Sequence, residues 1–583
     1  MTRHRLFFAT LVLVTIAGML AMMVRALDVD GLDAVDVVML VLFGITLPWL
    51  VVGFWNATIG FLIMSFSADP VGVVLPQACG VAPDAPITAS TAILLCIRNE
   101  SPRRILRNLE LTLSGLAQTG AADRFHVYVL SDTNDARIAT EEQVCFAELA
   151  SRWEQRLALT YRCRTANAGY KAGNIEDFCR QWGDLHDFAI VLDADSFMTP
   201  PAMLRLIRIM QGNPSIGILQ GLVVAMPSTS AFARIFQFGM RLGMRSYTMG
   251  SAWWQGDCGP YWGHNAVLRL DAFMQHCELP TLSADGSSNL HILSHDQVEA
   301  VLMRRGGYEV RVLPREDQSW EENPPTMLDF VRRDLRWCEG NMQYLRLLGM
   351  PGLKPTSRVQ LLLAIMMFIG SPAWVGMLVL GTAMVVLAPQ EAHVIDPVWG
   401  RVLVVVVLVM MFLPKIASAV DVLVRPVQRR QFGGGALFSL SFFIETVFSI
   451  LICPIMWLSQ AIFLSQLLFG RTQGWSSQTR DDHTVGWGQA LGVFWPHLLL
   501  GTVLLGSLAV RAPLVIPYAI FFLGGFVMAV PLAVVTSWPS VARFFIRAHI
   551  ASLPEEITPP AELRALQLPV FAMRASFARQ RER

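Results

Sequence analysis

The chain has 583 residues, of which 53% are hydrophobic and 16% are charged, whereas roughly 25% of residues are charged in an ordinary soluble protein. Charged residues crowd the stretch from about Asp84 to Lys354, so the middle is expected to face water and the flanks to face lipid. The formal net charge of +1 argues against a nucleic-acid partner, and nine cysteines without a Cys-x-x-Cys pair argue against a disulfide framework or a cysteine metal site.

The first predicted elements are two membrane spans, Leu6–Val24 and Val37–Met64, within residues 1–70. A cleaved signal peptide is the alternative for the first run, but that run exceeds the usual core of ~7–15 residues and no small-residue cleavage site follows it. Basic residues precede the first span and four aspartates lie between the two spans. Because positive residues favour the cytoplasm, the N-terminus and the region after Met64 are expected to be cytoplasmic.

The middle region, residues 85–355, alternates strand-like and helix-like segments. Short aliphatic and β-branched runs occupy Thr91–Ile97, Phe125–Leu130 and Phe188–Leu192, and helix-like stretches such as Pro102–Gly115 separate them. This alternation predicts an α/β domain with a largely parallel sheet. Ligands of such a sheet bind at the carboxyl ends of its strands.

Residues 356–540 are expected to return to the membrane. Further spans are predicted at Val359–Leu387, Val402–Val420, Gly492–Val510 and Leu514–Val535. Ala436–Phe469 is too long for one straight span and too short for two, so we expect interfacial or re-entrant helices on the cytoplasmic side. The sequence thus predicts about six spans, a polar cytoplasmic loop at residues 470–488 and a cytoplasmic tail at residues 541–583. No internal repeat is visible, which argues against many transporter folds.

Polar residues appear where each apolar strand stops. Asp132 follows the second strand, and Asp193 and Asp195 follow the third. Carboxylates two residues apart on an extended strand point to the same side and can hold a hard divalent cation together with substrate phosphates. An isolated Asp-x-Asp also occurs in solvated loops, but the preceding apolar strand favours the metal site. Lys171 either touches phosphate or simply begins a helix.

Later segments contain aromatic and charged candidates. Tyr261, Trp262, His264 and Asn265 combine aromatic and polar groups, as a carbohydrate site requires, although a packed loop would look similar. Asp296 precedes an amphipathic helix and is either a reactive carboxylate or an N-terminal cap. The candidates closest to the returning membrane are Arg333, Arg336 and Trp337. Arginines there can neutralise a diphosphate, or they can belong to an amphipathic helix on the membrane surface.

Taken together, these motifs resemble the inverting membrane β-glycan synthases that include cellulose synthase. That family carries a nucleotide-contacting Asp, an Asp-x-Asp, a catalytic Asp in a Thr-Glu-Asp-type motif and a Gln-x-x-Arg-Trp, in the order found here. Two departures are Ser-His-Asp in place of Thr-Glu-Asp and Arg333 in place of the glutamine. The phrases Lys-Ala-Gly-Asn-Ile-Glu-Asp, Tyr-Trp-Gly-His-Asn, Ile-Leu-Ser-His-Asp-Gln-Val-Glu-Ala and Arg-Asp-Leu-Arg-Trp-Cys-Glu-Gly-Asn resemble the glucans biosynthesis glucosyltransferase H family, from about Ala92 to about Pro560.

The resemblance implies an α/β GT-A-like cytoplasmic glycosyltransferase domain inserted between transmembrane helices of a bacterial inner membrane. It implies processive, inverting polymerisation of glucose from UDP-glucose into the linear β-1,2-glucan backbone of osmoregulated periplasmic glucans, coupled to export. The long N-terminal extension of some relatives is expected to be absent. Acyl carrier protein and periplasmic glucan-modifying proteins are implied partners, beside UDP-glucose, the growing glucan and membrane lipid.

The resemblance also implies residue roles. Asp296 would be the general base. The donor would contact Asp132, Lys171, Asp193, Arg333 and Arg336. The acceptor would contact Trp337, Tyr261, Trp262, His264 and Asn265. Asp193 and Asp195 would bind Mg²⁺ or Mn²⁺. Arg480, Asp481 and Asp482 would belong to a gating loop, unless residues 470–488 are merely a solvated loop.

Two alternatives remain open. The first is another polymer, such as cellulose, chitin or hyaluronan. The second is a transporter with a regulatory nucleotide-binding domain, which should show repeats or intramembrane charges along an ion path.

Overall fold

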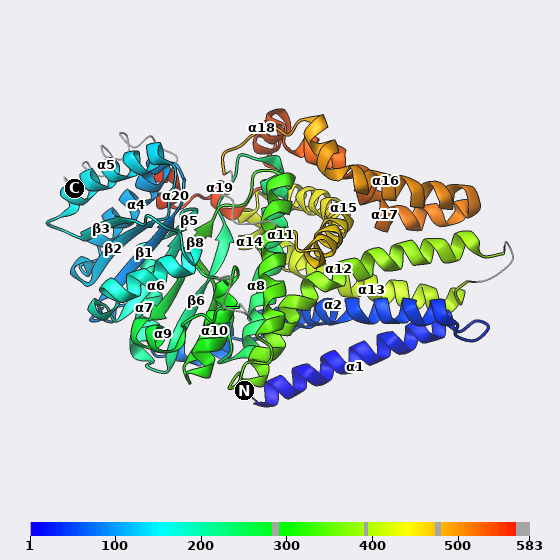
Figure 1. Ribbon diagram of the computed structural model, residues 1–583, viewed down its shortest axis with the longest axis horizontal. Helices are drawn as coiled ribbons and strands as arrows, with labels where there is room; N and C mark the ends of the chain where they lie inside the picture. The colour runs from blue at the N-terminus through cyan, green and yellow to red at the C-terminus, as the bar shows by residue number, and fades with distance from the viewer. Residues whose placement is uncertain (1, 283–290, 390–393, 473–479, 567–583) are drawn as a thin grey trace.

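The computed structural model describes residues 2–282, 291–389, 394–472 and 480–566. An α/β domain lies at one end of an elongated helical bundle (Figure 1). Among the described residues, seven helices are long and apolar enough to cross a membrane. They are α1 (Thr2–Leu27), α2 (Ala34–Phe66), α12 (Pro355–Leu387), α13 (Pro397–Val424), α15 (Gly435–Leu468), α16 (Trp487–Arg511) and α17 (Ile516–Thr536).

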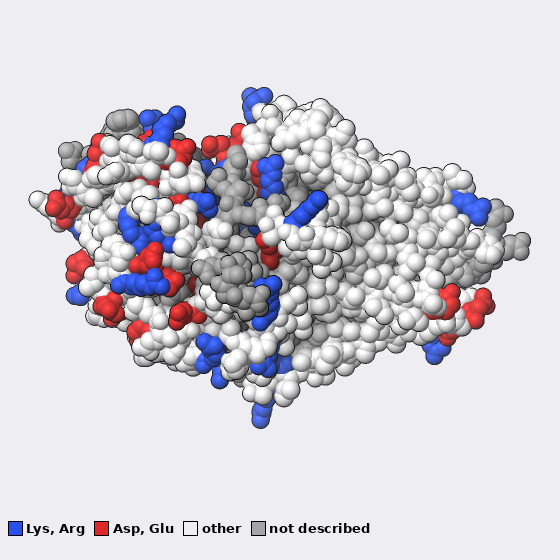
Figure 2. Space-filling model, in the orientation of Figure 1, with Lys and Arg blue, Asp and Glu red and all other residues white. Residues whose placement is uncertain are grey.

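The distribution of charge fits an α/β domain that faces water and a helical bundle that faces lipid. Figure 2 shows Lys, Arg, Asp and Glu gathered over the α/β domain, while the visible sides of the bundle are almost bare of charge. A few charged side chains reappear at the far end of the bundle, where the acidic α1–α2 connection lies. Seven long apolar helices, almost bare of charge on the visible face, suit the hydrocarbon of a bilayer, so the chain is a multi-pass membrane protein.

Helix α15 differs from the other candidate spans. It is one continuous helix of 34 residues, and Pro454 lies inside it. It packs against α17, α12 and α8 (Ala231–Gln255), and Figure 1 shows it lying across the bundle near the α/β domain while the other long helices run lengthwise. Of the two predicted alternatives, the re-entrant one does not fit, because the backbone does not turn back at Pro454, and the interfacial one stays a prediction. The placement of α15 on the cytoplasmic side stays a prediction.

The α/β domain is built on an eight-stranded mixed sheet with the strand order β3-β2-β1-β4-β7-β6-β8-β5. The three predicted strands form where expected, as β1 (Thr91–Ile97), β2 (Phe125–Ser131) and β4 (Phe188–Asp193). They pair in parallel, and β3 (Ala158–Cys163) adds a fourth parallel strand. Nearly every residue of the three predicted strands is buried, as is usual where helices cover both faces of a parallel sheet.

The other half of the sheet is less regular. Its strands are β5 (Ser196–Met198), β6 (Ile216–Ala225), β7 (Ala266–Arg269) and β8 (Glu309–Glu321). β7 runs antiparallel to β4 and to β6, and β5 runs antiparallel to β8. The prediction of a largely parallel sheet therefore holds only for the β3-β2-β1-β4 half.

Two hydrophobic cores sandwich the sheet. One is formed with α4 (Pro102–Ala117), α5 (Ala136–Trp153) and α7 (Pro200–Gly212). The opposite one is formed with α6 (Tyr170–Trp182), α9 (Leu270–His276) and α10 (His295–Arg305). This three-layer arrangement leaves the carboxyl ends of β1, β2 and β4 at a common edge.

The C-terminal segment returns from the bundle to the α/β domain. It continues through α18 (Pro539–Arg547), α19 (Pro554–Ile557) and α20 (Ala561–Leu566). The α20 leucines pack on Leu111, Phe197 and Trp320. The predicted tail at residues 541–583 therefore folds onto the α/β domain over its described part, and residues 567–583 lie outside the described residues.

The α/β domain is joined to the bundle by a close crossing of α2 and α8. A Cβ atom added to Gly60 would lie 1.8 Å from the carbonyl oxygen of Ser246, and one added to Gly250 would lie 1.9 Å from that of Asn56. Only glycine permits this approach. The Asn56 side chain reinforces it by accepting a 2.9 Å hydrogen bond from Trp254 Nε1.

We expect Gly250→Val to separate α8 from α2 and to destabilise the protein, because a side chain there overlaps backbone atoms. The cost should be at least the ~1–3 kcal/mol of ordinary overpacking. Gly243→Val on the same helix is the matched control, since nothing lies within 4 Å of its added Cβ. Thermal unfolding in detergent measures both; equal melting temperatures would contradict the close crossing.

Candidate active site

The candidate site lies at the carboxyl ends of the parallel strands. Asp132 follows β2 directly, Asp193 is the last residue of β4, and Asp195 comes two residues later. Asp132 and Asp195 are each 5% exposed, so these carboxylates are not part of a solvated loop.

Lys171 connects this edge to the rest of the site. It stands in the first turn of α6, and its ammonium group pairs with Asp193 and donates a 2.8 Å hydrogen bond to the carbonyl oxygen of Gly263. Lys171 therefore begins a helix and also reaches the strand ends, and its contact with phosphate stays a prediction.

Asp296 lies next to the same glycine. A Cβ atom added to Gly263 would lie 3.4 Å from Asp296 Cβ, 3.8 Å from Asp296 Oδ2 and 3.8 Å from Lys171 Nζ. Gly263 has a φ of +80°, a conformation that glycine adopts without strain. The turn thus brings Asp193, Lys171 and Asp296 together from three distant parts of the chain.

The partly buried pair of Lys171 and Asp193 is held in its charged form. Burial alone would raise the pKa of Asp193, but Lys171, His264 and Arg480 outweigh it and lower that pKa. Burial would lower the pKa of Lys171, but Asp193 and Cys96 outweigh it and raise that pKa. Charge is therefore fixed at this point, where a charged substrate group would bind.

Glu100 is a further carboxylate at this edge. It follows β1, and burial raises its pKa to about 6 although Arg480 opposes the shift. Its side chain accepts a hydrogen bond from the backbone N–H of Arg98. The sequence signal for Glu100 is its position just after an apolar strand, the same signal that marked Asp132 and Asp193.

The segment beginning at Arg480 lies over these carboxylates. Arg480 pairs with Asp195, Asp482 accepts a hydrogen bond from Thr229, and Asp481 lies 3.6 Å from Arg104. Residues 473–479 of the predicted gating loop lie outside the described residues. The segment therefore reaches the strand ends from far along the chain, and its gating role stays a prediction.

The two aspartates suit a hard divalent cation. Each already attracts a cationic side chain, Lys171 at Asp193 and Arg480 at Asp195. Within the described parts of the chain, no group of three or more His, Cys, Asp or Glu side chains forms a complete metal cage. Two carboxylates that leave room for phosphate oxygens are typical of Mg²⁺ and Mn²⁺ sites.

Trp337 and its neighbours form a separate part of the site on α11 (Met327–Gln343). The Trp337 side chain is 47% exposed, and the Arg333 guanidinium stacks 4.8 Å from its ring centroid. Arg333 lies 3.8 Å from Glu321, which in turn lies 3.7 Å from His264. Trp337 thus presents a ring to solvent from a charged framework that links α11 to the Gly263 turn.

The exposed fractions correct two of the acceptor predictions. Tyr261 is 1% exposed and belongs to the hydrophobic core of the sheet, so its ring is not available for stacking. Asn265 is fully buried and donates a 2.7 Å hydrogen bond to Ser319 Oγ. Trp262 is partly buried, and its backbone N–H donates to Gln220 at 2.8 Å.

The two arginines predicted to meet the donor also lie on α11. Arg333 is 6% exposed and faces Glu321 and Trp337, which sets it beside the acceptor candidate. Burial lowers the pKa of Arg336 to about 10, still well above neutral pH, so it stays cationic. Its contact with a donor stays a prediction.

The structure removes the capping alternative for Asp296. Ser294 is the N-terminal cap of α10, and Asp296 lies in the first turn. One residue before it, His295 forms an ion pair of 3.0 Å with Glu299, and both side chains are buried. Sequence reasoning missed Glu299, whose only signal is the i,i+4 spacing from His295.

We expect His295→Gln to destabilise the protein in a pH-dependent way. Burial lowers the pKa of His295, but Glu299 raises it more, so the net shift is upward. The ion pair therefore contributes fully below the ordinary histidine pKa of about 6.5 and is lost as pH rises through the raised value.

Thermal unfolding of wild type and His295→Gln across this pH range measures the effect. The difference in melting temperature should be largest at low pH and should shrink at high pH. A difference that grows with pH would contradict a charged His295.

Residues 188–459 match the family "Glycosyl transferase family group 2". The chain is 35% identical to a glucans biosynthesis glucosyltransferase H from Ralstonia nicotianae, over 97% of this chain and 67% of that protein. The same-named protein of Xanthomonas campestris pv. campestris is 34% identical over 94% of this chain and 86% of its own length.

The chain belongs to the glucans biosynthesis glucosyltransferase H family. It spans 63% of the length of a Pseudomonas putida member, to which it is 34% identical over 91% of this chain. The domain is therefore GT-A-like, as predicted from the resemblance. Among solved structures, a mannosyltransferase from Pyrobaculum calidifontis in complex with GDP-Man and Mn²⁺ is 14% identical with a TM-score of 0.43, covering 66% of this chain and 98% of that one. That score is too low to carry any conclusion about this chain.

Proposed function

We propose that this chain is a processive, inverting glucosyltransferase of the bacterial inner membrane that polymerises glucose from UDP-glucose. Its product would be the linear β-1,2-glucan backbone of osmoregulated periplasmic glucans. The observation that supports this most is the contact of Lys171 with Asp193 and with Gly263, beside Asp296. This contact supports the proposal because a cation that could bind phosphate lies between carboxylates that could hold a metal ion and a carboxylate that could act as base.

The donor would bind along the strand ends. Asp132 would accept hydrogen bonds from the uracil or ribose, and Lys171 would pair with a phosphate oxygen. Asp193 and Asp195 would hold Mg²⁺ or Mn²⁺, and the bound ion would stabilise the negative charge on the departing UDP. Arg480 would then leave Asp195, since the guanidinium and the ion compete for the same carboxylate.

The acceptor would bind between Trp337 and Asp296. Trp337 would stack on the terminal glucose ring. Asp296 would accept the proton of the attacking hydroxyl, while that oxygen forms a bond to the anomeric carbon and the bond to UDP breaks on the opposite face. Attack from the opposite face inverts the anomeric centre, which yields a β-linkage from an α-linked donor.

The product would cross the membrane beside the site. Basic residues such as Arg425, Arg429 and Arg430 lie at the end of α13 and on α14 (Pro426–Gln431), while aspartates fill the α1–α2 connection. The positive-inside tendency then favours a cytoplasmic α/β domain and export between α12–α17. Acyl carrier protein and periplasmic glucan-modifying proteins stay predicted partners.

We expect Asp296→Asn to reduce polymerisation by about 10²–10⁴-fold, the usual contribution of a positioned general base, while UDP binding stays near normal. Incorporation of labelled glucose by purified protein and UDP calorimetry measure the two effects. Asp271→Asn in the first turn of α9 is the matched control. Near-normal polymerisation by Asp296→Asn would remove the assigned base.

Trp337→Ala should weaken acceptor use while leaving UDP affinity unchanged, because the exposed ring is assigned to the acceptor sugar and not to the donor. Trp337→Phe keeps an aromatic face and should retain most of the activity. The apparent affinity for added glucan oligomers measures the effect. If both variants use oligomers as the wild type does, the stacking role is wrong.

The identity of the polymer is tested by supplying labelled UDP-glucose to purified protein with Mg²⁺ and analysing the linkage of the product. β-1,2-linked glucose supports the proposal. A β-1,4-linked product points to a cellulose-type synthase, and no incorporation of glucose contradicts a glucosyltransferase.

A further inference from the structure

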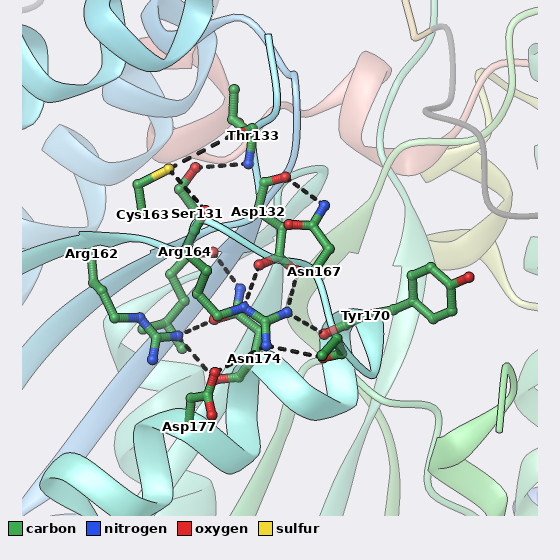
Figure 3. Close-up of polar contacts among 12 residues, drawn as sticks. Ser131, Asp132, Thr133, Arg162, Cys163, Arg164, Asn167, Tyr170, Asn174 and Asp177 are labelled. Atoms are coloured by element: carbon green, nitrogen blue, oxygen red, sulfur yellow. Dashed lines mark hydrogen bonds and ion pairs between the residues drawn. The ribbon is translucent and has the colours of Figure 1, made fainter. Parts of the chain in front are cut away.

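Arg164, which follows β3, makes an unusually complete set of contacts (Figure 3). A guanidinium has five N–H donors, and all five are used here. Nε and Nη2 donate to the two carboxylate oxygens of Asp132, at 2.7 and 2.8 Å. Nη2 also donates to the carbonyl oxygen of Tyr170 at 2.9 Å. Nη1 donates to Asp177 at 3.0 Å and to the carbonyl oxygen of Ala168 at 3.1 Å.

The ion pair with Asp132 is the most buried of these contacts. The side chains of Arg164 and Asp132 are each 7% exposed. Burial lowers the pKa of Arg164, but Asp132 and Asp177 raise it more, so the guanidinium stays charged. A lysine in this place has three donors and no planar fork, so it cannot bind both oxygens of Asp132 and the two carbonyl groups together.

The carbonyl groups belong to a strained turn that leads into α6. Gly169 and Tyr170 have φ values of +69° and +52°, two left-handed residues in succession. Glycine adopts this conformation freely, but a bulky residue such as tyrosine seldom does. A Cβ atom added to Gly169 would lie 3.1 Å from Gly173 Cα, so the turn is also tightly packed. Lys171 is the next residue, and its position depends on this turn.

We propose that Arg164 is a positioning residue that couples Asp132 to Lys171. The two side chains are then prearranged to bind a nucleoside diphosphate, Asp132 at the nucleoside and Lys171 at the phosphates. Arg164 fixes Asp132 as an ionised acceptor for N–H or O–H groups of the nucleoside. Through the carbonyl groups of Ala168 and Tyr170 it also sets the turn that aims Lys171 at the phosphates. This inference rests on the proposed use of a nucleotide-sugar donor.

The test compares UDP binding to the full-length wild type, Arg164→Lys and Arg162→Lys in detergent. Arg162 is the matched control, because it lies on β3 and donates to Asn174 of α6 at 3.1 Å, whereas its hydrogen bonds among the described residues include none to Asp132 or to the turn. We expect Arg164→Lys to weaken UDP binding at least about 10-fold and Arg162→Lys to weaken it less than about 3-fold. The KM for UDP-glucose should rise by a similar factor while kcat changes less.

Chemical rescue separates positioning from folding. Arg164→Gly should lose UDP affinity, and added guanidinium ion at non-denaturing concentration should restore part of it, whereas Arg162→Gly should show no rescue. If Arg164→Lys unfolds, rescue of Arg164→Gly decides. Wild-type affinity in Arg164→Lys, or loss in Arg164→Gly without rescue, overturns the inference. Absence of UDP binding by the wild type would instead contradict the proposed function.

Discussion

The structure depends on one partly buried ion pair, between Lys171 and Asp193. Two opposite charges removed from water are stabilising only when their geometry is good and their remaining donors are satisfied. Lys171 meets this condition by also donating to the carbonyl oxygen of Gly263. The pair therefore joins three elements at one point: the end of β4, the start of α6 and the Gly263 turn. Asp296 of α10 packs next to that turn. Reactive groups from distant parts of the chain share a site because this one cation joins them.

The rest of the molecule holds that site at the surface of a membrane. The close crossing of α2 and α8, made possible by Gly60 and Gly250, joins the α/β domain to the bundle. α11 carries Trp337 and leads into α12, so the candidate acceptor platform lies directly before a membrane helix. The C-terminal segment returns to the α/β domain, where Glu556 pairs with the buried Arg234.

Much of this architecture could be predicted from the sequence, because its signals are local. Apolar runs located the long helices, and β1, β2 and β4 began where expected, since buried parallel strands are continuously hydrophobic. Asp132, Asp193 and Asp195 were found because polarity changes abruptly at a strand end. Asp296 needed the family resemblance, since its tripeptide alone equally suits a helix cap.

The features that were missed are tertiary. Arg164 carries no motif, and its five partners become visible only when β2, β3 and α6 are folded together. Tyr261 resembles a sugar-stacking residue in sequence, but its neighbours in the fold bury it. α15 has the composition of a membrane span, and only packing against α8 and α12 sets its direction across the bundle. Arg480 reaches Asp195 over a separation that no local pattern encodes.

The central claim is that Asp193 and Asp195 form a divalent-cation site completed by a nucleoside diphosphate. Electron paramagnetic resonance of Mn²⁺ added to the full-length protein, with and without UDP, tests it most directly. The account predicts UDP-dependent Mn²⁺ binding in the wild type and in Asp296→Asn, and its loss in Asp195→Asn. Mn²⁺ binding that is indifferent to UDP or that survives Asp195→Asn would contradict it.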